Sequence, residues 1–235
     1  AELVLTNGSI DIQHGSSASI ASIMTSTGSS LVLRDMDITS STAGILPAGD
    51  SSEVVIEDCT VNALEYALST NRAESSRVRI VVRNSNLSAS YSTTVMINTS
   101  ADAHIYDSTI TGPVHGIILR AGVLEVKDST IIVNDTDPSI YSANNFASGY
   151  GFQGFWGTGN TIPAGAIVVG DYTKPYGAGI FSYSGDSVLT LSNTKLKSAV
   201  DTGAMPEILI AAYDPSKTAS VTYDDSCTVG DVVVY

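Results

Sequence analysis

One short pattern recurs along the whole chain and constrains its fold more than any other feature. Two apolar residues alternate with variable ones, Asp or Asn follows, and another apolar residue comes three positions later. The copies occupy residues 3–7, 31–35, 54–58, 80–84, 103–107, 124–128, 189–193 and, in a weaker form, 221–225. Short runs that alternate with period two, and that first return every 21 to 28 residues, predict the strands of a solenoid.

Other repeat architectures fit this pattern less well. No run keeps a 3.6-residue periodicity long enough for a helix, and a propeller blade needs about 40–50 residues. We therefore expect an all-β parallel β-helix, with residues 1–235 forming a single domain. The interval between Asp128 and Asn193 should hold two further turns and a loop insertion at 136–163. This brings the expected total to about nine or ten coils.

The recurring Asp and Asn residues have a structural explanation. Each stands where one short strand would bend into the next, and both residue types tolerate the left-handed conformation that such a bend needs. Residues four and two positions earlier should point inward, and these pairs, from Leu3/Leu5 to Val221/Tyr223, are apolar or aromatic. We therefore interpret the Asp/Asn column as structural and not as a set of eight catalytic acids.

The charge of the chain excludes several classes of partner. With 11 basic and 24 acidic residues, the net charge is −13, and such a chain repels phosphate backbones and anionic membranes. No apolar run approaches about 18 residues, so no segment is expected to insert into a membrane. Cys59 and Cys227 belong to different coils, and several coil spacings of about 4.8 Å place them beyond disulfide distance.

The outward positions form ladders from coil to coil. One ladder contains Arg34, Glu57 and Arg83, an alternation that would support the register of neighbouring coils. Another begins with Val4, Val32, Val55 and Val81, and continues with His104 and Glu125, an expected ion pair. The four valines reflect either the β-propensity of an exposed strand or a face covered by a loop, a neighbouring domain or a partner subunit.

The repeat resembles the right-handed parallel β-helix superfamily of pectate lyases, polygalacturonases, phage tailspikes and autotransporter passengers. The stretch 176–193, YGAGIFSYSGDSVLTLSN, is most similar to the repeats of passengers and surface adhesins. The resemblance covers nearly all of the chain except about 136–163. It implies a pectate-lyase-like fold and leaves the activity open, because this fold carries many functions.

The window 141–183 holds 10 of the 16 aromatic residues. One interpretation is a platform on which aromatic rings stack against sugar rings. The other is that these side chains pack the insertion onto the solenoid, the commoner fate of aromatic residues. The candidate ligand-binding residues are Tyr150, Phe152, Phe155, Trp156, Tyr172 and Tyr176.

The catalytic motifs that the resemblance would imply are incomplete. A lyase similar to pectate lyase would need a calcium-binding acidic cluster and a basic residue, and a hydrolase similar to polygalacturonase would need three carboxylates, Gly-His-Gly and Arg-x-Lys. The sequence has no Arg-x-Lys, and Val114-His115-Gly116 lacks the first glycine. The best remaining catalytic set is Asp107, His115, Arg120 and Asp128, whose paired carboxylates would share a proton or hold calcium. No other cofactor is expected.

These features favour a non-catalytic adhesion or glycan-binding module of bacterial type, extracellular or at the cell surface. Its expected ligand is a glycan or another host or cell-surface molecule. The first alternative is a polysaccharide lyase or glycoside hydrolase of the pectate-lyase-like fold, and the second is a structural stalk or assembly domain. Both solenoid ends look uncapped, so we expect flanking domains in a longer chain, or self-association through the ends or the valine stripe.

Overall fold

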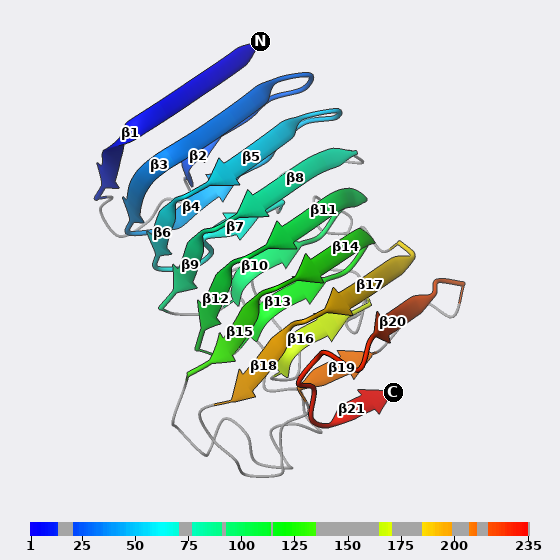
Figure 1. The fold of residues 1–235 in the computed structure, drawn as a ribbon. Helices are drawn as coiled ribbons and strands as arrows, with labels where there is room; N and C mark the ends of the chain where they lie inside the picture. The colour runs from blue at the N-terminus through cyan, green and yellow to red at the C-terminus, as the bar shows by residue number, and fades with distance from the viewer. Residues whose placement is uncertain are drawn as a thin grey trace.

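A computed structural model describes residues 1–13, 21–70, 77–90, 93–113, 115–134, 165–170, 185–198, 207–210 and 216–234. Within these ranges the protein is all-β, and every strand pair is parallel. Successive coils stack along one axis from the N-terminus to the C-terminus (Figure 1). This confirms the predicted parallel solenoid, in which each coil contributes up to three short strands that we call its first, second and third legs.

The three legs form three continuous ladders. The first leg comprises β5 (Glu53–Glu57), β8 (Val78–Arg83), β11 (Ala101–Tyr106), β14 (Gly122–Lys127), β17 (Ser187–Ser192) and β20 (Ala219–Tyr223). The second comprises β6 (Thr60–Ala63), β9 (Asn86–Ala89), β12 (Thr109–Gly112), β15 (Thr130–Val133) and β18 (Lys195–Ser198). In the first two coils, β1 (Glu2–Ile12) and β3 (Ser30–Ser40) run through both legs without a break.

The third leg forms a separate sheet of eight strands. These are β2 (Ala21–Met24), β4 (Ala43–Leu46), β7 (Leu68–Ser69), β10 (Thr93–Ile97), β13 (His115–Leu119), β16 (Gly165–Val169), β19 (Ile208–Ile210) and β21 (Val232–Val234). A core of aliphatic side chains from all three legs fills the space that they enclose.

The described strands form eight coils, and the expectation of nine or ten was wrong. The two further turns predicted between Asp128 and Asn193 do not exist, because β14 pairs directly with β17 and β15 with β18. The only strand described between β15 and β17 is β16, which is the third leg of the sixth coil. The extra residues therefore lengthen one coil, and the predicted insertion at 136–163 lies outside the described residues.

The bend between the first and second legs is set by the Asp/Asn column. Seven of the eight predicted positions have a positive φ between 43° and 55°: Asn7, Asp35, Asp58, Asn84, Asp107, Asp128 and Asn193. The left-handed conformation therefore turns the chain at the same point in each of these coils. Asp225, in the weaker copy, is not among the residues with positive φ.

A buried hydroxyl ladder supports this bend from inside. The Oγ of Ser85 accepts a hydrogen bond from the amide of Cys59, the Oγ of Ser108 from the amide of Ser85, and the Oγ of Ser129 from the amide of Ser108. Each serine also donates to the carbonyl two residues earlier, at 2.6–2.7 Å. The serine side chains thus satisfy backbone amides that would otherwise be buried without partners where the strand ladder is interrupted.

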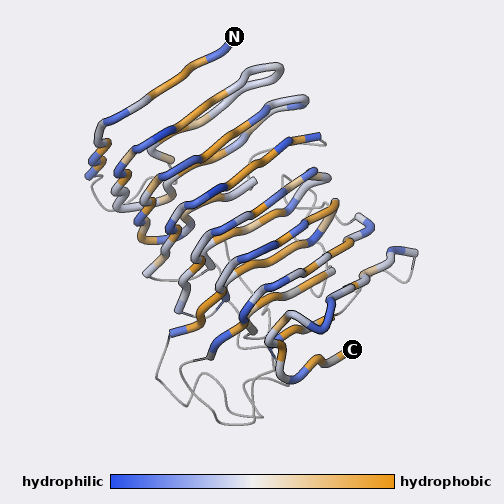
Figure 2. Tube along the Cα trace, in the orientation of Figure 1, coloured by the Kyte–Doolittle hydropathy of each residue, from blue (hydrophilic) through white to orange (hydrophobic). Residues whose placement is uncertain are grey.

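The inward pairs form the core, except at the ends of the solenoid. Both members are buried in each of the second to seventh coils. In the first coil, Leu3 is 50% exposed, and in the eighth, Tyr223 is 48% exposed, because each has a neighbouring coil on one side only. Apolar and polar residues alternate along the strands accordingly (Figure 2).

The predicted interactions on the outer face of the first leg are present. Glu57 accepts from Arg34 at 2.7 Å and from Arg83 at 3.3 Å, so the expected charge alternation is confirmed. The guanidinium of Arg34 holds the pKa of the Glu57 carboxyl below its usual range. A second pair joins Arg79 to Glu53. Cys59 and Cys227 are both free, as predicted.

The hydroxyl ladder predicts that Ser108→Ala is costly although it removes one atom. The Ser85 amide would lose its acceptor in a site where Ser108 is buried. We expect the free energy of unfolding to fall by about 1–3 kcal/mol, the cost of an unsatisfied buried polar group. Urea unfolding measures this change, with Thr190→Ala on the exposed face of β17 as the control. Equal stability of the two variants would contradict the role assigned to the ladder.

The bend predicts that Asp107→Ala is less stable than Asp107→Gly. With φ at 50°, any residue with a Cβ pays a steric penalty that glycine avoids. The difference between the two variants should be about 1 kcal/mol in favour of glycine. At Thr190, in regular strand conformation on β17, the order should reverse, because glycine weakens a strand. Thermal unfolding of the four variants checks both orders.

Candidate functional site

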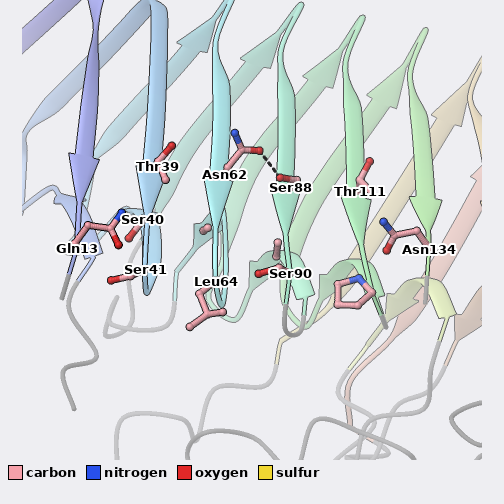
Figure 3. A pocket seen from close by; sticks show the side chains of 13 residues that line it. Gln13, Thr39, Ser40, Ser41, Asn62, Leu64, Ser88, Ser90, Thr111 and Asn134 are labelled. Atoms are coloured by element: carbon pink, nitrogen blue, oxygen red, sulfur yellow. Dashed lines mark hydrogen bonds between the residues drawn. The ribbon is translucent and has the colours of Figure 1, made fainter. Parts of the chain in front are cut away.

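A groove of about 660 Å³ runs along the outer face of the second leg (Figure 3). It crosses six coils, from Gln13 just after β1 to Asn134 just after β15. Neighbouring coils are about 4.8 Å apart, so the groove extends for about 24 Å along the solenoid axis. Its shape suits an extended, chain-like ligand.

Every described residue that lines the groove is uncharged, in a chain whose net charge is −13. All are Ser, Thr, Asn, Gln, Ala, Leu or Pro. Asn62 Oδ1 accepts a hydrogen bond of 2.6 Å from the Ser88 hydroxyl, which leaves the Asn62 amide group as a donor. Leu64, which is 43% exposed, adds an apolar surface beside this polar row. The groove therefore offers hydroxyl and amide groups, with small apolar patches, and no charge.

The row of polar side chains follows directly from the register. Thr39 pairs with Asn62, Asn62 with Ser88, and Ser88 with Thr111, so the four lie in one column across the second to fifth coils (Figure 3). The groove was not predicted, although its signal is present in the sequence. Each of these residues stands four positions after a bend Asp or Asn, at an outward site where small polar residues recur.

A second cluster lies on the outer face of the first leg, around His104. Its Nδ1 is 3.1 Å from Glu125 Oε2, and its Nε2 is 3.0 Å from Asp102 Oδ1. The predicted contact between His104 and Glu125 is thus confirmed. The Tyr106 hydroxyl donates to Glu125 Oε2 at 2.5 Å and lies 2.9 Å from His104 Nδ1. The guanidinium of Arg83 lies over the Tyr106 ring, 5.6 Å from its centre.

This network shifts two protonation equilibria. Burial, followed by the hydrogen bond to Glu125, raises the pKa of Tyr106 to about 12. The hydrogen bonds from Tyr106 and then His104 lower the pKa of Glu125. Glu125 therefore stabilises the fold at neutral pH, and this contribution is lost in acid as its carboxylate is protonated.

The structure brings together only two of the four catalytic candidates. Asp107 and Asp128 line a cavity of about 330 Å³ with Arg83, Tyr106, Glu125 and Lys127. His115 is fully buried in β13 of the other sheet, where its Nδ1 is 3.1 Å from Thr93 Oγ1. Arg120 is buried just after β13. Both carboxylates belong to the left-handed bend column, and Asp128 accepts a hydrogen bond of 2.6 Å from Asn193.

Two other predicted features have mixed outcomes. The aromatic candidates Tyr150, Phe152, Phe155, Trp156, Tyr172 and Tyr176 all lie outside the described residues, so the stacking platform stays a prediction. The valine stripe is present but unevenly covered: Val4 is 47% exposed, whereas Val81 is 3% exposed. Val81 stands next to His104 in the register and between two arginines along its strand.

The described part of the chain contains no group of three or more His, Cys, Asp or Glu side chains arranged to hold a metal ion. Among the same residues there is no helix long and apolar enough to cross a membrane. The described residues thus form a parallel β-solenoid with an axial groove that has no charged lining residue. Comparison with protein-family models, curated proteins and solved structures gives no match to this chain.

The Tyr106 network predicts a specific loss of stability in alkali. The phenol titrates near pH 10 in the unfolded chain but at about 12 in the folded protein. Its contribution is fully present below pH 10 and is lost as the pH rises from 10 to 12. Tyr106→Phe should therefore lose less stability than the wild type over this range. Urea midpoints between pH 9 and 12 measure the difference, with Tyr223→Phe at an exposed position as control.

Proposed function

We propose that the protein is a non-catalytic glycan-binding module of a secreted or cell-surface protein, and that the axial groove is its binding site. The observation that carries this proposal is the column of Thr39, Asn62, Ser88 and Thr111 in a groove without charged lining residues. Sugars present many hydroxyl groups of both donor and acceptor character. Side-chain hydroxyl and amide groups match that character.

The groove favours a neutral, linear glycan. An extended polysaccharide repeats at intervals similar to the spacing between coils, so successive sugars would meet equivalent side chains. Polyanionic chains are disfavoured, because the protein carries a net charge of −13 and the described groove supplies no cation. Short side chains also lose little rotamer entropy when a ligand orders them.

The aromatic segment extends this proposal. Asn134 lines the end of the groove, and Tyr150, Phe152, Phe155 and Trp156 follow it in the sequence. Aromatic side chains carried from that point would supply the stacking surfaces that the groove lacks. Adhesion to host or cell-surface glycans is the corresponding role for the whole module.

The groove predicts binding of neutral linear oligosaccharides, which isothermal titration would measure. The panel consists of hexasaccharides of glucose, xylose, mannose and N-acetylglucosamine. Asn62→Ala and Thr111→Ala should each weaken binding by about two- to tenfold, the worth of one hydrogen bond. Ser88→Trp should abolish binding by filling the groove, whereas Thr190→Trp, on the exposed face of β17, should leave it intact.

Two outcomes would contradict this function. Failure of every hexasaccharide to bind would remove the groove as a glycan site, as would equal binding by the two tryptophan variants. Mass spectrometry of the same mixtures after long incubation with calcium should detect no shorter product. Shortened sugars would establish the lyase or hydrolase instead and direct attention to Asp107 and Asp128.

A further inference from the structure

The groove column continues into the seventh coil, where its character changes. Thr111 pairs with Ile132, and Ile132 pairs with Lys197 of β18. The parallel column beside it runs from Thr109 through Thr130 to Lys195. Lys197 and Lys195 therefore occupy these two columns one coil beyond the last groove residue, with Ile132 between Thr111 and Lys197.

These two lysines differ from four other cations of the outer surface. Arg34, Arg79, Arg83 and Lys127 each lie within 4 Å of a carboxylate. Lys195 and Lys197 are exposed, and neither forms an ion pair with any residue in the described ranges. Arg77 and Lys217 likewise form no ion pair with a described residue. The bend carboxylate of the preceding coil, Asp128, already faces Lys127 and accepts from Asn193.

Their spacing brings two like charges to the same face. Residues i and i+2 of a strand point the same way and stand about 7 Å apart. Two ammonium groups at this distance that form no ion pair within the described ranges repel each other. A single anionic group placed between them would accept a charge-assisted hydrogen bond from each.

We infer that Lys195 and Lys197 form an anion subsite at the C-terminal end of the groove, and that the ligand is a neutral glycan carrying one acidic group at that end. This inference rests on the proposed function, because it assumes that the glycan lies in the groove. The acidic group is a carboxylate, as in a terminal uronic or aldonic acid, or a sulfate or phosphate ester. The remaining sugars are uncharged, as the groove requires.

The experiment compares matched forms of one hexasaccharide that binds the groove. The uncharged form is its alditol, and the charged forms carry a single carboxylate at the reducing end, as the aldonate, or at the non-reducing end, as the uronate. We expect one of the charged forms to bind on the order of tenfold more tightly than the alditol at low salt. This gain should shrink as the salt concentration rises, because the lysines are exposed.

Charge removal at the subsite supplies the control. The double variant Lys195→Gln/Lys197→Gln should bind the alditol as the wild type does and lose the gain for the acidic form. Lys217→Gln, which removes a cation outside the second leg, should keep that gain. Retained alditol binding also shows that the double variant is folded.

The experiment distinguishes failure of the anion subsite from failure of the proposed glycan-binding groove. Equal affinity for the alditol and both charged forms would overturn the anion subsite and leave the neutral groove in place. A gain that survives in the double variant would also overturn it. If none of the three forms binds, the proposed function itself is overturned, and the subsite with it.

Discussion

The solenoid depends on one local interaction, the left-handed bend that joins the first leg to the second. At each of these bends, an Asp or Asn adopts a positive φ, and from the second coil onward the next residue is buried. From the third to the sixth coil the hydroxyl ladder accepts hydrogen bonds from the backbone amides at the bend. In the seventh coil, the Thr194 hydroxyl donates to the carbonyl of Ser192. Where the ladder is present, removing a hydroxyl would leave a buried amide at the bend unsatisfied.

The fixed bend also determines which side chains reach the surface together. Because every coil turns at the same residue, positions before and after the bend stack in register over many coils. The ladders before the bend carry the paired charges and the His104 network. The ladder four residues after it carries the groove. One backbone constraint therefore separates the paired charges before the bend from a groove whose described lining residues are uncharged.

Much of this could be predicted from sequence, because the bend has a strict local signature. The positions of Asn7 to Asn193, the inward pairs and the contact of His104 with Glu125 all follow from counting residues relative to the bend. The number of coils could not be counted in this way. The interval after Asp128 contains one lengthened coil, and length alone does not distinguish that from additional coils. The groove was overlooked because Ser and Thr on outward strand positions are common, and only their alignment across coils gives them meaning.

A stack of coils joined only to their neighbours has a mechanical weakness along its axis. Each coil loses the contacts of its neighbour when that neighbour unfolds, so unfolding can begin at an end and proceed inward one coil at a time. A glycan lying in the axial groove would contact six coils simultaneously, whereas each coil of the polypeptide contacts only its neighbours. Such a ligand would stabilise the stack of coils against opening from its ends. The solenoid would then resist mechanical unfolding better with the glycan bound than without it.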